Sequence, residues 1–170
     1  MNRILTLDRT VVLKVLLLDM LSVLAVYTIP AISHLLAYPL YLFDPMRLFV
    51  LLGFMVYRNK WNSCALAVTL PLVSFLLSGH PVAIKSGLIA VELLTNVLLL
   101  SFMLSRRFNS TVSLVSSIFV SKLVYYGLKF GAISYGLLNA ELVATDWIYQ
   151  MIVVGLICLM WYVWDKYTFN

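Results

Sequence analysis

The sequence predicts an all-α, polytopic integral membrane protein with about six transmembrane helices and both termini in the cytoplasm. Hydrophobic residues make up 63% of the 170 residues and charged residues only 11%, whereas soluble domains average about 45–50% and about 25%. The mean hydropathy of +1.00 also indicates a membrane protein, because the core of a soluble protein of this length cannot bury so much apolar surface. The apolar runs are too long for barrel strands and do not alternate with a period of two.

The whole chain, residues 1–170, is predicted to form a single domain. Its first half contains three predicted helices. The helix over 11–37 contains Pro30, which kinks or ends it. Lys14 and Asp19 interrupt its apolar run, so we interpret it as a retained span and not as a cleaved signal peptide. After a turn-rich connection come a short helix over 46–57 and a longer one over 61–78.

The second half contains three more predicted helices. A Ser78-Gly79-His80-Pro81 turn separates the third helix from the fourth. The fourth helix ends before Arg106-Arg107, and a polar link joins the last two helices. Spans of about 17–25 residues suit a bilayer, and the predicted ranges are 82–104, 111–130 and 146–164.

Basic residues in the short links predict the orientation. They fall at alternate ends of the helices, so they gather on one side of the membrane, which is the cytoplasmic side by the positive-inside rule. The residues are Arg3, Arg9, Arg58, Lys60, Arg106, Arg107 and Lys166. The chain is therefore expected to be a multi-pass protein of the cell (plasma or inner) membrane, with the lipid bilayer as a partner.

Ionisable residues inside the apolar helices are the candidates for function, because such side chains are costly in a bilayer and usually face a partner or a cavity. At about 1.5 Å per residue, Glu92 and Lys122 both reach the middle of the membrane and form the natural pair. Helical spacing places Lys85, Glu92 and Asn96 on one face. Lys122 and Tyr126 share a face of the fifth helix, and Gln150 with Trp147 begins the sixth.

Structural interpretations of the same residues remain open. The Glu92–Lys122 pair is also suited to bridging two helices without binding any solute. Lys85 and Lys129 lie near an interface, where long cationic side chains snorkel to water. His80 suits an ordinary loop position, and Trp147 an interfacial aromatic belt.

Several function classes find no support in the sequence. No GxSxG or HExxH motif occurs and no nucleophile lies beside an evident base, so we predict no enzyme and no catalytic residue. His34 and His80 lack a third ligand, so no metal site and no cofactor are predicted. No basic run is long enough to follow a phosphate backbone, which argues against nucleic acid.

The segment PLVSFLLSGHPVAIKSGLIAVELLTNVLL resembles the substrate-binding S components of energy-coupling factor transporters. The similarity consists of Pro71, the outer Gly79-His80-Pro81 turn and the acidic Glu92-Leu93 pair, together with the length and the six-helix count. The first helix departs from the family pattern, because Ser22 and Ala25 lack the four-residue spacing of small residues that docks the scaffold subunit.

The resemblance implies capture of a vitamin or related micronutrient from outside the cell. A separate membrane scaffold subunit and two cytoplasmic ATPases would supply the energy. The implied site lies in the outer half of helices four to six, and its residues are His80, Lys85, Glu92, Asn96, Lys122, Tyr126, Trp147 and Gln150. The surplus of lysines favours an anionic group on this small-molecule substrate, and the aromatic side chains favour a ring.

A second hypothesis is a non-enzymatic scaffold of a cell-envelope complex, similar to the rod-shape protein MreD in size and topology. Its intramembrane charges would join helices or partners and would bind no solute. The surroundings of Glu92 distinguish the hypotheses, because a solvent-reachable cavity favours a binder and a closed bridge favours a scaffold.

Overall fold

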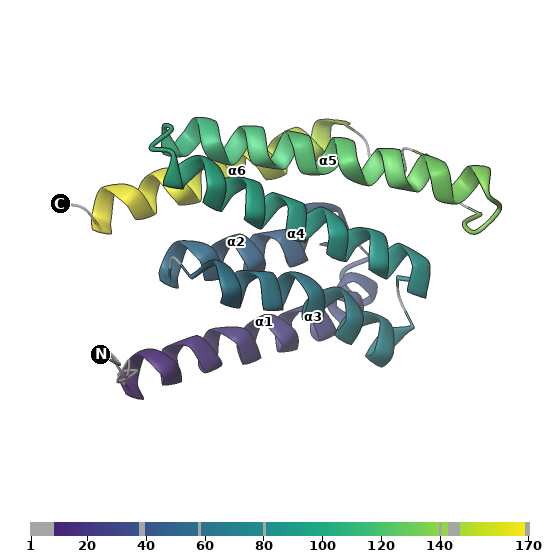
Figure 1. Ribbon diagram of the computed structural model, residues 1–170. Helices are drawn as coiled ribbons and strands as arrows, with labels where there is room; N and C mark the ends of the chain where they lie inside the picture. The colour runs from purple at the N-terminus through teal and green to yellow at the C-terminus, as the bar shows by residue number, and fades with distance from the viewer. Residues whose placement is uncertain are drawn as a thin grey trace, which may run out of the picture.

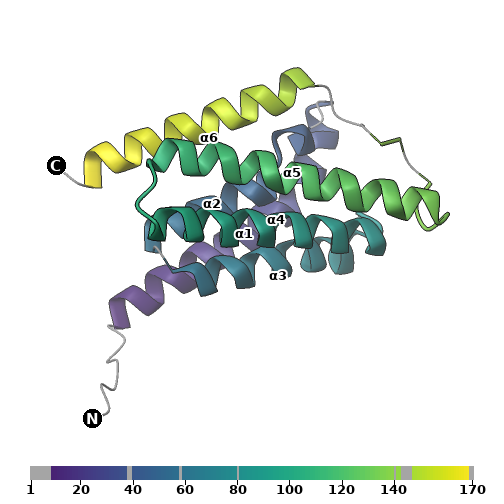
Figure 2. The ribbon, with the colours of Figure 1, turned by 45° about the horizontal axis from the view of Figure 1, so that its top comes forward.

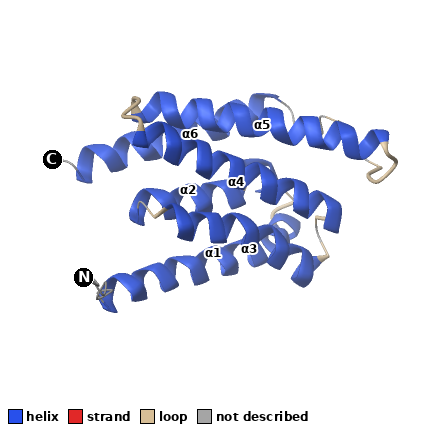
Figure 3. Cartoon of the chain, in the orientation of Figure 1, coloured by secondary structure: helices blue, strands red, loops and turns tan. Residues whose placement is uncertain are grey.

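A computed structural model describes residues 9–37, 40–57, 59–79, 81–139, 141–142 and 147–168, without the side chains of residues 9–11, 41, 147, 167 and 168. Every regular element among these residues is helical (Figure 3). The all-α prediction with six helices is confirmed. The elements are α1 (Arg9–Leu35), the 3₁₀-helix η1 (Leu40–Phe43), α2 (Pro45–Tyr57), α3 (Lys60–Ser78), α4 (Ala83–Ser105), α5 (Ser110–Ser134) and α6 (Trp147–Thr168).

Five of the helices are long and apolar enough to cross a membrane, and α2 is the exception. The 13 residues of α2 extend about 20 Å at 1.5 Å per residue, which is shorter than the hydrocarbon core of about 30 Å. The chain is thus a multi-pass membrane protein in which one helix crosses only part of the bilayer.

Local sequence signals explain where the helices begin and end. The side chains of Asn59 and Asn109 accept hydrogen bonds from the second backbone N–H of α3 and α5, respectively, as helix-capping asparagines do. Gly79 ends α3 with φ of +67° and donates its N–H to the Phe75 carbonyl, a conformation that favours glycine. Pro45 opens α2, where its fixed φ and missing N–H cost nothing.

The helices form one bundle in which α1, α3, α4 and α5 follow one another, with α2 and α6 behind them (Figure 1). The start of α1, the end of α6 and the links α2–α3 and α4–α5 lie at one end, which we call the basic end (Figure 2). The remaining links lie at the opposite, outer end. Both ends of the described chain therefore lie on one side of the membrane, as predicted.

Much of the bundle interior is apolar, and so is much of its outer surface. Leu51, Leu70, Leu93 and Leu114 are completely buried between the helices. Large hydrophobic side chains such as Leu76 are exposed on the outside. Lipid tails cover such a surface at no cost, so the helices pack through close contact and polar contacts more than through hydrophobic burial.

Gly53 on α2 permits one of these close contacts, because a Cβ built there would lie 3.1 Å from Leu66 Cδ1 of α3. We expect Gly53→Leu to lower the free energy of unfolding by about 1–3 kcal/mol through overpacking. Unfolding in mixed detergent micelles, followed by circular dichroism, measures this loss. The control is Gly127→Leu, since Gly127 is exposed and no atom lies within 4 Å of its built Cβ. Equal losses in both variants would show that α2 and α3 do not pack this closely.

Candidate functional site: a buried ion cluster in the outer half of the bundle

Four charged side chains from three segments form one contact network, which we call the ion cluster: Asp44, Arg47, Glu92 and Lys122. The Arg47 guanidinium donates a hydrogen bond to Glu92 Oε1, and its Nε lies 3.2 Å from Asp44 Oδ2. Lys122 Nζ lies 3.0 Å from Glu92 Oε1 and 3.6 Å from Asp44 Oδ2. Two carboxylates and two cations give the ion cluster a net charge of zero.

Burial differs between the two halves of the ion cluster. The side chains of Arg47 and Glu92 are 2% and 5% exposed. Those of Lys122 and Asp44 are both 27% exposed. The Arg47–Glu92 pair is therefore the closed base of the ion cluster, and Lys122 with Asp44 forms a side that other groups can reach.

The ion cluster lies near the middle of the membrane. Glu92 and Lys122 are about 20 Å and 18 Å from the basic ends of α4 and α5 at 1.5 Å per residue. Arg47 lies about 15 Å from the basic end of the short helix α2 on the same scale. Because a bare charge at this depth costs several kcal/mol, mutual pairing is what allows the four groups to be charged there.

The backbone before α2 brings Asp44 to this depth. Asp44 has φ of +48°, a left-handed conformation that aspartate tolerates better than most residues, and its carbonyl accepts the N–H of Leu48. The preceding η1 packs against α1 and α6, and the Leu40 N–H donates to Ser33 Oγ of α1. Irregular backbone is tolerated at membrane depth when protein surrounds it.

Aromatic and amide groups of α5 and α6 lie on the outer side of Lys122. Gln150 Nε2 donates to Tyr126 Oη at 3.0 Å, which joins the two helices. The Tyr125 ring packs edge-on against Tyr126, with ring centroids 5.5 Å apart. The ammonium groups of Lys122 and Lys129 lie 5.8 Å and 5.9 Å from the Tyr125 centroid, within cation–π range.

The outer end above these rings carries further charge. Lys129 is 2% exposed and donates from Nζ to the Leu142 carbonyl at 2.9 Å. The alternative that Lys129 snorkels to water is therefore wrong, because the link after α5 covers it. Lys85 is half-buried and within electrostatic reach of Lys129, as is Glu141. Among the described residues around the site there are four cations and three carboxylates: Arg47, Lys85, Lys122 and Lys129, and Asp44, Glu92 and Glu141.

Asn96 lies one turn below Glu92 and is 1% exposed. Its Nδ2 donates to Ser121 Oγ at 3.3 Å, and its Oδ1 has no hydrogen-bond partner within the described residues. Asn96 thus extends the polar interior toward the basic end and joins α4 to α5.

The structure brings most of the sequence-predicted site residues to one region. Glu92 contacts Lys122 as predicted, and Tyr126 contacts Gln150. Asn96 and Lys85 lie on α4 on either side of Glu92. His80 and the side chain of Trp147 lie outside the described residues. Whether any of these residues binds a solute stays a prediction.

Sequence reasoning missed Arg47 and Asp44, which complete the ion cluster. The sequence does carry a signal for Arg47, since it is a basic residue at the outer end of a short apolar helix, where the positive-inside rule makes such residues rare. Asp44 precedes it by three residues, a spacing that allows an ion pair. A second signal is the length of α2, which is too short to lift Arg47 out of the membrane.

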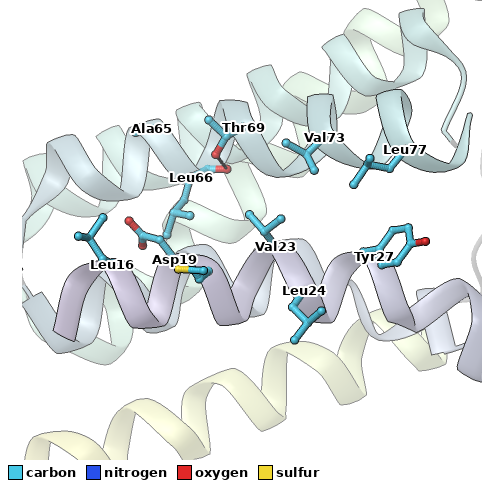
Figure 4. Close-up of a pocket in the computed structure, with 11 residues that line it drawn as sticks. Leu16, Asp19, Val23, Leu24, Tyr27, Ala65, Leu66, Thr69, Val73 and Leu77 are labelled. Carbon is cyan, nitrogen blue, oxygen red and sulfur yellow. Dashed lines mark hydrogen bonds between the residues drawn. The ribbon is translucent and has the colours of Figure 1, made fainter. Parts of the chain in front are cut away.

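A groove of about 570 Å³ lies between α1 and α3 and shares no residue with the ion cluster (Figure 4). Figure 4 shows Leu24, Val73 and Leu77 along it, with Tyr27 at one end. Asp19 lines it and accepts a hydrogen bond from Asn62 Nδ2 at 3.2 Å. The predicted cavity among α4, α5 and α6 does not coincide with this groove.

The arrangement places cations beside aromatic rings. Lys122 is partly exposed and has two carboxylate partners that an incoming anion can replace.

Among the described residues no group of three or more His, Cys, Asp or Glu side chains lies together as a metal site would require. No protein-family model, curated protein or solved structure matches this chain.

Proposed function

We propose that this chain is the substrate-capture subunit of a micronutrient uptake transporter in the cell membrane, related to the S components of energy-coupling factor transporters. It takes a small solute with an anionic group and a ring from outside, and a membrane scaffold subunit with cytoplasmic ATPases powers its release. The observation that carries the proposal is the exposed side of the ion cluster, where Lys122 lies beside Tyr125 and the Tyr126–Gln150 pair.

The chemistry of these residues supports the choice of solute. Cations outnumber carboxylates among the described residues around the site, which favours an anionic group over a cationic one. The Tyr126 ring is half-buried and offers an apolar face with a polar tip, which suits a flat ring bearing polar substituents. Pockets for small ligands commonly combine apolar walls with a few such polar anchors.

The closed side of the ion cluster favours a second candidate, a non-enzymatic scaffold of a cell-envelope complex. Glu92 is buried and paired with two cations, as a helix-joining bridge would be. In that case the ion cluster only fixes the positions of α2, α4 and α5, and the exposed side of Lys122 has no ligand.

Mass spectrometry of small molecules released from the mildly solubilised full chain tests the proposal. We expect wild-type protein to release one anionic, ring-bearing solute, and Gln150→Leu to lose it, since this change removes the hydrogen bond to Tyr126. Met151→Leu is the matched control, because Met151 is 68% exposed on the same helix. Wild-type protein that carries no solute but copurifies with envelope-synthesis proteins would contradict the proposal and favour the scaffold.

A further inference from the structure

A second cavity lies at the basic end of the bundle, on the opposite half from the ion cluster. It has a volume of about 190 Å³ and is lined by Lys60 of α3 and by Leu98, Ser101, Phe102 and Ser105 of α4. We call it the basic-end pocket. This volume has room for about six waters at about 30 Å³ per water. It is smaller than the volume of about 300–1,000 Å³ that is usual for pockets that enclose a whole small-molecule ligand.

The lining of the basic-end pocket combines apolar and polar residues of α4. The four residues of α4 follow helical spacing on one face, and the pocket extends about 10 Å from Ser105 down to Leu98 at 1.5 Å per residue. Leu98 and Phe102 are 51% and 54% exposed and therefore border lipid. Ser101, Ser105 and Lys60 form the polar part of the lining.

One cation lines this pocket and a second lies beside one of its lining residues. Lys60 begins α3, so the positive end of the helix dipole adds to its ammonium charge. The Arg106 guanidinium lies 5.4 Å from the ring centroid of Phe102, which lines the pocket. Lys60 Nζ lies 5.2 Å from the Trp61 centroid, and Trp61 is 72% exposed, as is common for tryptophan at a membrane surface.

We propose that the basic-end pocket binds one anionic phospholipid, with its phosphate between Lys60 and Arg106 and an acyl chain along Phe102 and Leu98. Lys60 and Ser105 at the basic end of the pocket and Leu98 at its deeper end match the order of groups in a lipid that enters from the bilayer. Basic pockets between membrane helices on the cytoplasmic side are suited to anionic headgroups, and the basic end is the predicted cytoplasmic side. This proposal does not depend on the solute-capture function.

Lipid retention tests the proposal on the full chain reconstituted in vesicles of equal parts phosphatidylcholine and phosphatidylglycerol. After mild extraction, native mass spectrometry counts the bound lipids, and titration of phosphatidylglycerol into delipidated protein gives the dissociation constant. We expect wild-type protein to retain one phosphatidylglycerol in preference to phosphatidylcholine. Each cation contributes about 1 kcal/mol, so we expect Lys60→Ala to bind about fivefold more weakly and the double variant with Arg106→Ala about 25-fold more weakly.

Three further variants separate a specific site from general surface charge. Lys166→Ala removes a cation at the same end of α6, outside the pocket, and should leave the affinity within twofold. Lys60→Arg should keep the lipid, and Ser101→Phe should displace it by filling the pocket without a change in charge. Equal weakening by Lys166→Ala and Lys60→Ala, or equal retention of both lipids by wild-type protein, would overturn the proposal.

Discussion

Arg47→Ala lowers the free energy of unfolding by about 3–5 kcal/mol, the usual cost of removing one partner from a buried ion pair. The loss arises because Glu92 is left buried with only Lys122 as a partner, and Asp44 loses its nearest cation. Reversible unfolding in mixed detergent micelles, followed by circular dichroism, measures the change. The control is Lys166→Ala, because Lys166 is exposed near the end of α6 and surface changes usually remain within about 0.5 kcal/mol.

A double variant tests whether the loss comes from unpaired charge or from lost packing. Arg47→Met combined with Glu92→Leu removes one cation and one anion and leaves Asp44 paired with Lys122 at 3.6 Å. Apolar replacement of a whole buried pair is often neutral, so the double variant should be more stable than Arg47→Ala alone. An Arg47→Ala protein as stable as wild type would contradict the burial of a charged network at this position.

Lys122→Gln weakens binding of the captured solute by at least about 30-fold, since loss of one partner from a desolvated charge pair costs about 2–5 kcal/mol. The expectation rests on the position of Lys122 at the accessible side of the ion cluster, 27% exposed and next to the Tyr125 ring. Titration calorimetry with the solute recovered from wild-type protein measures the dissociation constant.

The effect must come from the site and not from the total charge of the protein. Lys14→Gln makes the same change on the exposed surface of α1 and should leave the affinity within twofold. Glu92 remains paired with Arg47 in Lys122→Gln, so the fold should persist and circular dichroism should be unchanged. Unaltered affinity in a folded Lys122→Gln protein would place the anionic group elsewhere.

The sequence predicts the helices well because long apolar runs leave few alternatives in a bilayer. Each observed boundary lies within a few residues of the predicted one: the first helix covers Arg9–Leu35 where 11–37 was predicted, for example. The largest shifts, of four residues, are at the ends of α5 and α6, which continue to Ser134 and Thr168 beyond the predicted ends at 130 and 164. Gly131 is compatible with a continuing helix here, and Ala132 and Ile133 extend the apolar run.

The site is only partly predictable because it depends on a short helix and on links between helices. Glu92 and Lys122 could be paired by depth alone, since both belong to full spans. Arg47 carries only indirect signals in the sequence, because its contact with Glu92 also depends on the course of the backbone at Asp44. Lys129 is buried because the chain folds back to place the Leu142 carbonyl above it, a contact that helical periodicity does not contain.

Accessibility of the ion cluster from outside the cell is the most direct test of the solute-capture proposal. In a Cys64→Ser/Cys158→Ser background, Tyr126→Cys introduces a single thiol at a half-buried position on the accessible side. Ser117→Cys is the matched control on the same helix, since Ser117 is 0% exposed and lies toward the basic end. Intact cells are treated with a membrane-impermeant methanethiosulfonate reagent, which reacts only with thiols that water reaches.

We predict that Tyr126→Cys is modified from outside while Ser117→Cys is not. Such a pattern requires a water-filled path from the outer surface to the neighbourhood of Lys122. A Tyr126→Cys protein that folds normally but stays unmodified until it is denatured would contradict solute capture. That result would favour a closed ion cluster, whose role is to join α2, α4 and α5 in a scaffold.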